Sequence, residues 1–453
     1  MISLAVAMGI GRFAFTPLFP LMVRDGLIDS HAGAMLAAAN YLGYLAGALV
    51  AARIRIKPAL LLALGLAGTV LLTAAVCVAA LASLAVAMGI GRFAFTPLFP
   101  LMVRDGLLDS HAGAMLAAAN YLGYLVGALS AGRLRVRPAL LLALGLAGTV
   151  IITAAVGWTA SGFWWAVLRF LAGVMSAWTL VATSAWGLGW LAALGRPDLA
   201  GVQFSGVGIG IAAAGLFCLL LGSSLPSPQL WIGLAALGAL ASVLPLVLSR
   251  SLPSPPAAPA SSAPASVAAP SNTAGLIVCY TLFGFGYILP ATYLPALARQ
   301  LVDDPHVFGL AWPVFGAAAA VSTVLVSWRL ARANRLSVWA AAHLLMALGV
   351  LLPAVWTSLT SVTLAALLVG GTFMVITMVG MQEARARAEG QATRVLGRMT
   401  AGFALGQLAG PLVSAGIARL TASEAGALKL ALALSALGLL ASSFYLWRLR
   451  RDD

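Results

Sequence analysis

Charged residues are scarce in this chain of 453 residues. Only 8% of the residues are Asp, Glu, Lys or Arg, and only 12 residues are acidic. The mean hydropathy is +1.02, and 62% of the residues are hydrophobic. A water-soluble domain carries about a quarter of its residues as charged side chains. The composition therefore excludes a soluble protein and indicates an integral membrane protein.

Cysteine pairs and common catalytic motifs are also lacking. Cys77, Cys218 and Cys279 lie apart in apolar stretches, which excludes a disulfide framework and a cysteine metal site. The sequence has no GxxxxGKS/T, HExxH or GxSxG motif, so we expect no enzyme, no catalytic residue, no cofactor and no metal. The 26 Lys and Arg residues occur in small groups between apolar stretches, so the net charge of +14 does not predict nucleic-acid binding.

Long apolar runs fill most of the chain. About fifteen runs follow one another, each near the roughly 20 residues that a spanning helix needs. They lack the alternating pattern of a transmembrane barrel. The sequence therefore predicts an all-α polytopic protein in the lipid bilayer. The apolar amino terminus has no basic start and no cleavage site, so we do not expect a removable signal peptide.

A tandem repeat occupies the beginning of the chain. Residues 3–76 recur as residues 83–156, with 65 of 74 positions identical. Identity this high indicates a recent duplication, because lipid-facing positions drift quickly. We interpret residues 1–82 as a peripheral or artefactual duplicate of the first two to three helices, and residues 83–453 as the functional unit.

A second repeat relates positions 195 residues apart inside this unit. The matching pairs are Gly89 and Gly284, Gly91 and Gly286, Pro100 and Pro295, Arg104 and Arg299, Asp109 and Asp304, and Arg137 and Arg332. Because charged loop positions share the register, we expect two six-helix halves, residues 83–250 and 274–453. Residues 251–273 are rich in Pro, Ser and Ala and are expected to form a linker.

Twelve spanning segments are expected in the unit. They are residues 83–103, 112–131, 138–157, 161–185, 199–222, 228–248, 274–298, 307–328, 336–355, 358–381, 395–418 and 425–447. If the first segment starts in the cytoplasm, fifteen Arg residues lie on the cytoplasmic side and four Lys or Arg residues lie on the other. Basic residues are retained in the cytoplasm, so both ends of the unit are expected there.

The duplicate complicates this topology. It has three apolar segments, residues 3–23, 32–51 and 58–82, and an odd number of added spans would invert the unit. Either the duplicate inserts in the opposite orientation, or its third segment does not span the membrane.

Several motifs resemble one family. The chain contains GIGRFAFTPLFPLM, AAANYLGYLVGAL, GFGYILPATYLPALAR and RVLGRMTAGFALGQLAGP within two parallel-related halves. These motifs resemble the YbfB/YjiJ-type branch of the major facilitator superfamily, over essentially all of residues 83–453. The resemblance implies a twelve-helix fold and solute transport by alternating access. Arg169, in the segment RFLAG, also resembles the Arg motif in the fourth helix of the superfamily.

The chain departs from the superfamily pattern in two places. The loop GALSAGRLRVR keeps Gly127 and Arg133, to which the resemblance assigns helix packing and gating, but it lacks the usual aspartate. The fifth helix contains several glycines but no Gly-Pro pair, so the antiporter signature is incomplete.

Two arginines are expected near the middle of the bilayer. A charged residue there costs about 2.5 to 3.5 kcal/mol on insertion scales, so it needs a reason. Arg92 is the tenth residue of the segment 83–103, and Arg169 is similarly central in the segment 161–185. We interpret both as ligands for an anionic group of the substrate. The alternative is that each guanidinium bonds to backbone carbonyls near Gly and Pro.

No carboxylate is expected in the middle of a span. The candidates for proton coupling are therefore Glu383, at the cytoplasmic end of the tenth helix, and His343, in the ninth. Structural roles compete with coupling, because Glu383 can pair with Arg387 one turn later and His343 can be a hydrogen-bonded interior residue. Facilitated diffusion, exchange and coupling through the charge of the substrate stay open.

Neutral polar residues can complete a cavity between the halves. The candidates are Asn120, Tyr121 and Tyr124 in the second helix, Gln203 in the fifth, Tyr280, Tyr287 and Tyr293 in the seventh, and Gln407 in the eleventh. Two sets of glycines with GxxxG spacing, Gly123 with Gly127 and Gly406 with Gly410, are expected to allow close packing or sliding of the halves. Pro411 is expected to kink its helix.

These features together predict a multi-pass, monomeric transporter in a bacterial inner membrane. We expect it to carry a small organic, anionic solute, with or without protons, by alternating access. Two alternatives are a sensor or assembly subunit that kept the transporter fold and a lipid flippase.

Overall fold

The computed structural model describes residues 58–134, 136–252, 273–301, 305–388, 391–421 and 424–452. Most of the predicted duplicate and most of the predicted linker lie outside these residues. The chain divides into two compact units, Met1–Leu71 and Leu72–Asp453. Apart from residues 58–71, the features discussed below belong to the second unit.

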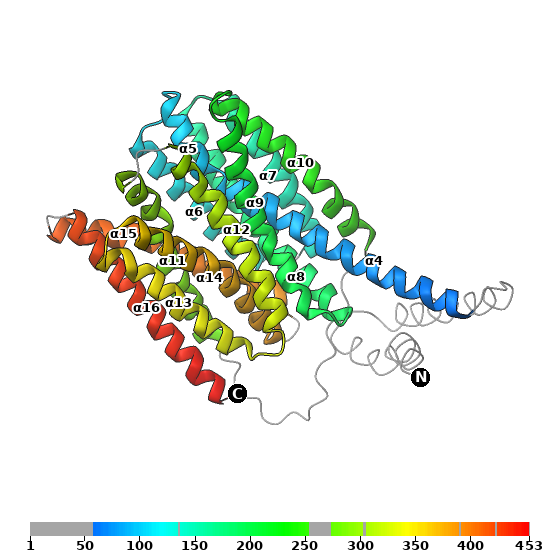
Figure 1. Ribbon diagram of the computed structural model, residues 1–453. Coiled ribbons are helices and arrows are strands. Elements are labelled where there is room, and N and C mark those ends of the chain that lie inside the picture. The colour runs from blue at the N-terminus through cyan, green and yellow to red at the C-terminus, as the bar shows by residue number, and fades with distance from the viewer. Residues whose placement is uncertain are drawn as a thin grey trace. The chain divides into compact units, whose positions relative to one another are not determined.

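All regular elements of the described residues are helices (Figure 1). Twelve of the described helices are long and apolar enough to cross a membrane, which confirms the predicted all-α polytopic fold. After the first span they are α6 (Ser110–Ala131), α7 (Pro138–Trp158), α8 (Gly162–Ala193), α9 (Ala200–Leu221), α10 (Ser227–Ser251), α11 (Thr273–Leu301), α12 (Pro305–Arg329), α13 (Arg335–Val355), α14 (Leu359–Ala386), α15 (Ala392–Thr421) and α16 (Glu424–Asp452). A short 3-10 helix, η3 (Pro197–Leu199), precedes α9.

Local residue chemistry explains where several helices begin. The carboxylate of Asp109 accepts a hydrogen bond from the backbone N–H of Ala112, 2.7 Å away, and so caps α6. Pro138 starts α7, because proline fits the first turn of a helix, where its missing N–H is not needed. Ser358 and Ser361 bond to each other's backbone N–H groups and form a capping box at the start of α14.

The first span differs from the prediction. The predicted break at residue 83 is wrong, because α4 (Pro58–Leu84) continues directly into the π-helix η2 (Ala85–Phe93) and then into α5 (Phe95–Arg104). The linking residues Leu84 and Ala94 both have right-handed helical backbone angles. Residues 63–91 contain no proline and no charged residue, so nothing interrupts the helix. The third segment of the duplicate and the first helix of the unit therefore form one helical stretch.

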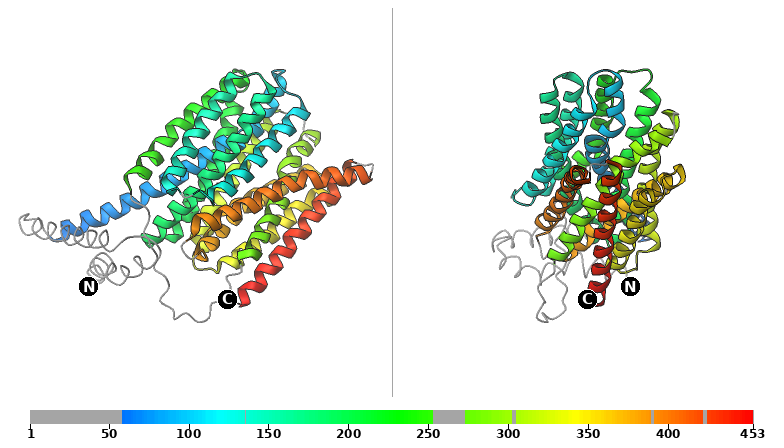
Figure 2. Two further views of the ribbon diagram at one scale, coloured as in Figure 1. Left: turned by 180° about the vertical axis from the view of Figure 1, so that it is seen from behind. Right: turned by 90° about the vertical axis from the view of Figure 1, so that its left-hand side faces the viewer.

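Within residues 72–453 we distinguish an N-terminal half, up to α10, and a C-terminal half, from α11 to α16 (Figures 1 and 2). The halves contact each other mainly through α9 with α12 and through α6 with α15. The loops that follow α6, α8 and α12 carry arginines. Two contacts between the halves lie in or near these loops: Ser327 bonds to Asp198, and Gly132 lies against Arg394. We call this end of the bundle the basic end.

The predicted glycine pairs pack helices inside each half. A Cβ atom on Gly123 would lie 1.9 Å from the carbonyl oxygen of Phe170 in α8, and a Cβ atom on Gly406 would lie 2.1 Å from the carbonyl oxygen of Thr281 in α11. Both contacts join helices of one half, so the idea that these glycines let the halves slide is wrong. They are packing residues, as expected from the close backbone approach that glycine permits.

A different set of glycines lines the boundary between the halves. Gly201, Gly208 and Gly215 recur every seven residues along α9 and face α12. A Cβ atom on Gly208 would lie 2.5 Å from the carbonyl oxygen of Gly316, and one on Gly316 would lie 2.6 Å from the carbonyl oxygen of Gly208. The backbones of α9 and α12 are therefore in direct contact. We call these four residues the inter-half glycine seam.

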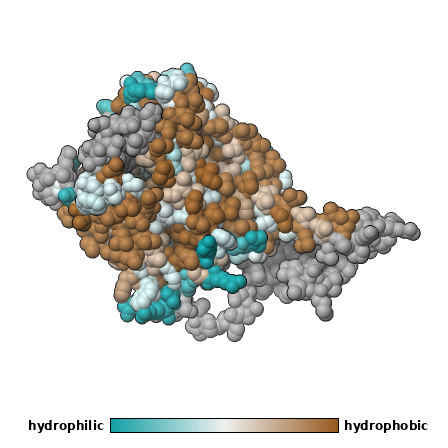
Figure 3. Space-filling view, in the orientation of Figure 1, coloured by the Kyte–Doolittle hydropathy of each residue, from teal (hydrophilic) through white to brown (hydrophobic). Residues whose placement is uncertain are grey.

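Apolar side chains cover the side of the bundle. Figure 3 shows hydrophobic residues over the middle of the visible face and hydrophilic residues near its ends. Large exposed side chains such as Leu240, Leu412 and Phe163 are 70–74% accessible. Lipid is the medium that such a surface requires.

Candidate functional site

Arg92 lies at the boundary between the two halves. It is in the last turn of η2, and only 3% of its surface is exposed. Its Nη2 atom donates to Oε1 of Gln407 in α15, which belongs to the other half. The guanidinium carbon lies 3.7 Å from the centre of the Tyr124 ring and 5.9 Å from the centre of the Phe403 ring. The first and eleventh spans are thus joined through one buried cation.

The polar atoms around Arg92 are mostly donors without a partner. Nε and Nη1 of Arg92, Nε2 of Gln407 and the hydroxyl of Tyr287 are buried and form no hydrogen bond in the structure. The Tyr287 ring stacks on Phe373 at 4.5 Å and lies 6.0 Å from Phe403, the ring that also faces Arg92. Unpaired buried donors cost about 1–3 kcal/mol each, and more when they are charged. This cluster is chemically suited to a ligand that supplies oxygen acceptors.

No described carboxylate neutralises Arg92. Ion pairs in which both partners are described residues join Arg104 with Asp105, Arg196 with Asp198, and Glu383 with both Arg335 and Arg387. All of them lie at the ends of helices. A buried charge without a counter-ion is unfavourable, so an anion placed beside Arg92 would be stabilised.

Arg169 has a different environment from Arg92. It is also 3% exposed, but its Nη1 and Nη2 atoms donate to the backbone carbonyls of Gly91 and Arg92, each at 3.0 Å. Both terminal nitrogens of Arg169 therefore bond to backbone carbonyls, as the alternative interpretation of the sequence expects. Both carbonyls belong to the π-helix η2.

The other predicted cavity residues are divided between the site and the helix interiors. Tyr121 lies beside Arg92, with its ring centre 5.8 Å from the guanidinium carbon. Asn120 is turned toward α8, where its Nδ2 donates to the carbonyl of Arg169 at 2.9 Å. Gln203 is buried, and its Nε2 lies 3.5 Å from the carbonyl of Thr183. The side chain of Tyr293 lies outside the described residues.

The two candidates for proton coupling both have structural partners. Nε2 of His343 accepts a hydrogen bond from Nε1 of Trp339, one turn earlier, at 3.0 Å. The neutral ring therefore carries its proton on Nδ1, which is buried and has no partner. Glu383 accepts from Nε of Arg387 at 2.7 Å and lies 3.5 Å from Nη1 of Arg335. The competing structural interpretations of both residues agree with these bonds.

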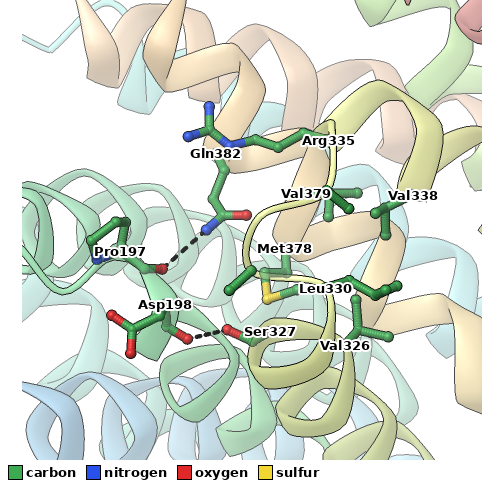
Figure 4. Close-up of a pocket in the computed structure, with 12 residues that line it drawn as sticks. Pro197, Asp198, Val326, Ser327, Leu330, Arg335, Val338, Met378, Val379 and Gln382 are labelled. Carbon is green, nitrogen blue, oxygen red and sulfur yellow. Dashed lines mark hydrogen bonds between the residues drawn. The ribbon is translucent and has the colours of Figure 1, made fainter.

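A cavity of about 80 Å³ lies at the basic end, between η3 and helices α12 to α14 (Figure 4). Hydrogen bonds cross it from one half to the other. Ser327 donates to the carbonyl of Asp198 and accepts from the N–H of Gly201, and Gln382 donates to the carbonyl of Pro197 at 3.5 Å. Arg92 does not line this cavity. The bonds link the two halves at the basic end, and Arg92 is enclosed in protein.

Sequence reasoning missed several residues of this arrangement. Ser176, Ser327 and Gln382 carry no motif, and each matters only because a carbonyl of another element lies opposite its side chain. The inter-half glycine seam was detectable, because Gly201, Gly208 and Gly215 are spaced by seven residues.

Two further predicted residues lie outside η2, the element that carries Arg92. Arg133 lies in the turn after α6 with an exposed side chain, and Pro411 lies inside the helix α15.

Comparison with known proteins agrees with this architecture. The model of the family described as "Uncharacterised MFS-type transporter YbfB" matches residues 4–83 and residues 84–445. The solved structure of the human organic anion transporter MFSD10 (TETRAN) is similar in fold, with a TM-score of 0.61 and 18% sequence identity. The match covers 83% of this chain and 98% of that one. No curated protein matches the sequence.

The two stretches of the family match meet between residues 83 and 84, one residue from the predicted boundary of the duplicate. Twelve described helices that are able to span a membrane, a transporter family model and a transporter fold agree with one another. The chain belongs to the YbfB-type family of major facilitator superfamily transporters, which are non-enzymatic, multi-pass membrane proteins.

Proposed function

We propose that this protein carries a small organic anion across the membrane by alternating access and that Arg92 binds the anionic group. One observation carries the proposal. Arg92 is buried where the halves meet, two of its nitrogens have no partner, and no described carboxylate pairs with it. An anion would supply both the missing negative charge and the missing acceptors.

The neighbours of Arg92 support a ligand with an oxygen-bearing head group. Gln407 and Tyr287 hold further unpartnered polar atoms, and both come from the C-terminal half. An anion held by Arg92 and these two residues would therefore contact both halves at once. Binding at such a position biases the equilibrium between conformations, provided that the contacts differ between them.

The distribution of charge predicts the orientation of the carrier in the membrane and the driving force of transport. The basic end is expected to face the cytoplasm of a bacterial inner membrane, because Lys and Arg are retained there. Transport of an anion moves charge, so the membrane potential can drive it without a titrating side chain.

Glu383 stays the candidate for proton coupling. A Glu383→Gln variant with unchanged pH dependence of transport would rule out that role. We expect the carrier to act as a monomer.

Ligand binding to the purified full chain tests the proposal. A thermal-shift panel should include monocarboxylates, dicarboxylates, phosphate, neutral sugars and amines. We expect one class of anion to raise the unfolding temperature of the wild type and to have no effect on Arg92→Gln. Anions that stabilise the wild type should then exchange across proteoliposomes containing it. An Arg92→Gln protein that binds and transports the same anion as the wild type does would overturn the proposal.

A further inference from the structure

The segment that carries Arg92 is a π-helix of nine residues. η2 (Ala85–Phe93) lies between the α-helices α4 and α5, and Arg92 is in its last turn. A π turn contains about one residue more than an α turn, and π segments inside α-helices are frequent at functional sites. One residue corresponds to about 100° of rotation around a helix axis. The π turn therefore determines the direction in which Arg92 points.

Side chains from α8 hold the carbonyls of this segment. Arg169 donates to the carbonyls of Gly91 and Arg92. Two turns later in α8, the hydroxyl of Ser176 lies 2.7 Å from the carbonyl of Ala87 and 2.7 Å from the carbonyl of Ala172 in its own helix. Arg169 and Ser176 are seven residues apart, so they lie on one face of α8. Together they contact three carbonyls of η2.

Arg169 is itself fixed in place. The backbone carbonyl of Arg169 accepts a hydrogen bond from Asn120 at 2.9 Å, and the guanidinium carbon lies 4.8 Å from the centre of the Phe95 ring. A Cβ atom on Gly173 would lie 2.2 Å from the carbonyl oxygen of Asn120, so α6 and α8 pack tightly here. The two terminal nitrogens of Arg169 are thus directed at the backbone, whereas those of Arg92 are directed at the boundary between the halves.

We propose that Arg169 is a positioning residue. Together with Ser176, it holds the π-helical turn of η2 in the conformation that aims Arg92 at Gln407. Anion binding by Arg92 rests on the function proposed above, but the stabilisation of η2 by Arg169 and Ser176 does not depend on that function. The buried charge of Arg169 serves the backbone of η2 and does not contact the substrate.

Hydrogen exchange of the full chain in nanodiscs tests, without any ligand, whether Arg169 and Ser176 stabilise η2. In Arg169→Gln, the amides of residues 85–94 should exchange at least tenfold faster than in the wild type, because two charge-assisted bonds to carbonyls are lost. In Ser176→Ala they should exchange about threefold faster, because one shared bond is lost. The matched control is Ser184→Ala, also in α8, where the buried hydroxyl has no partner. It should leave exchange in residues 85–94 unchanged.

Two results would overturn the proposal. The first is unchanged exchange of residues 85–94 in both Arg169→Gln and Ser176→Ala, the milder variant that removes a single hydroxyl. The second applies once an anion binds in the thermal-shift panel. A positioning role predicts that Ser176→Ala weakens anion binding and that its effect and that of Arg169→Gln are not additive. Unchanged anion binding in Ser176→Ala, with binding lost in Arg169→Gln, would make Arg169 a ligand.

The two proposals fail in different ways. If no anion binds the wild type, the function proposed for Arg92 fails, and the exchange experiment still decides the role of Arg169. If an anion binds through Arg92 while the exchange rates stay unchanged in both variants, only the positioning role fails.

Discussion

Arg92 and Gln407 lie 315 positions apart in the chain and share a buried hydrogen bond in which the guanidinium donates to the amide oxygen. The bond leaves the amide nitrogen of Gln407 and two nitrogens of Arg92 without partners. Hydrogen-bond donors thus outnumber acceptors at the meeting point of the two halves. This imbalance is the basis of the anion site proposed for Arg92.

A Gln407→Glu substitution should weaken anion binding, because the new carboxylate would neutralise the charge of Arg92. Glutamate has nearly the same shape as glutamine, but its carboxylate would pair with Arg92 and occupy the place of the anion. We expect the Kd for a stabilising anion to rise at least tenfold, because each factor of ten corresponds to only about 1.4 kcal/mol. Binding can be measured by thermal shift or isothermal titration.

The matched control is Gln407→Ala, which removes the amide without adding charge. It should weaken anion binding less than Gln407→Glu does, since Arg92 stays unpaired. Anion binding by Gln407→Glu that equals wild-type binding would contradict an anion site at Arg92.

Helix positions were predictable from the sequence because the physical signals are local. The segment 138–157 is apolar and bounded by Pro138 and a basic loop, and the structure has α7 at Pro138–Trp158. The missing break at residue 83 was not predictable in this way. A repeat boundary in the sequence need not be a turn, because a helix continues wherever no residue interrupts it.

The different environments of Arg92 and Arg169 were beyond sequence reasoning. Both are arginines in the middle of apolar spans, and their sequence contexts suggested the same role. Their environments differ because Arg169 donates to two carbonyls of η2, whereas Arg92 donates to Gln407 of the other half. A π turn has no sequence signature beyond the permissive glycines Gly89 and Gly91, so its register appears only in three dimensions.

A Gly208→Ala substitution should destabilise the contact between the halves. The added Cβ atom would lie 2.5 Å from the backbone of Gly316 and Ala320, neither of which can rotate away. Overpacking of this kind typically costs about 1–3 kcal/mol. We expect a lower unfolding temperature in detergent, measured by intrinsic fluorescence.

Gly371→Ala is the matched control, because no atom lies within 4 Å of the position of its Cβ. Alanine is the better helix former by up to about 1 kcal/mol, so this variant should be neutral or slightly stabilising. Equal unfolding temperatures for the two variants would mean that the inter-half glycine seam does not require glycine.

Asp105 should make stability sensitive to acid. Its carboxylate accepts a hydrogen bond from the N–H of Ser227 at 2.7 Å, at the start of α10, and pairs with Arg104 at 2.7 Å. Burial alone would raise the pKa of Asp105, but Ser227 and Arg104 outweigh it, and the pKa lies below its usual value. A lowered folded-state pKa gives stability that is fully present above the unfolded-state pKa of about 3.9 and is lost as the pH falls through the folded-state pKa.

An Asp105→Ala variant should therefore unfold at a lower temperature than the wild type at pH 5 to 8, by an amount typical of a lost helix cap, about 1 kcal/mol. The difference should shrink below pH 4, as the wild-type carboxylate becomes protonated. Asp105→Asn keeps an acceptor for Ser227 without the charge and should fall between the two. A difference between Asp105→Ala and the wild type that stays constant down to pH 2 would show that the charge of Asp105 does not contribute.

A disulfide across the basic end should stop transport. A Cβ atom on Gly132, after α6, would lie 3.4 Å from the Cα atom of Arg394, near the start of α15, so cysteines at both positions are close enough to bond. The three native cysteines are buried and should not interfere. If the halves separate at this end during each cycle, oxidised Gly132→Cys/Arg394→Cys protein should lose uptake of any anion that the wild type carries. Dithiothreitol should restore it.

The single variants Gly132→Cys and Arg394→Cys separate the cross-link from the substitutions themselves. Each should transport at the same rate with and without oxidant, because a single introduced cysteine lacks its engineered partner and the native cysteines are buried. Alternating access requires the halves to separate at the basic end, and the contact between α6 and α15 is one of those that join them. Full uptake by the oxidised double variant, with the disulfide verified by mass spectrometry, would mean that the basic end stays closed throughout transport and that the mechanism proposed here is wrong.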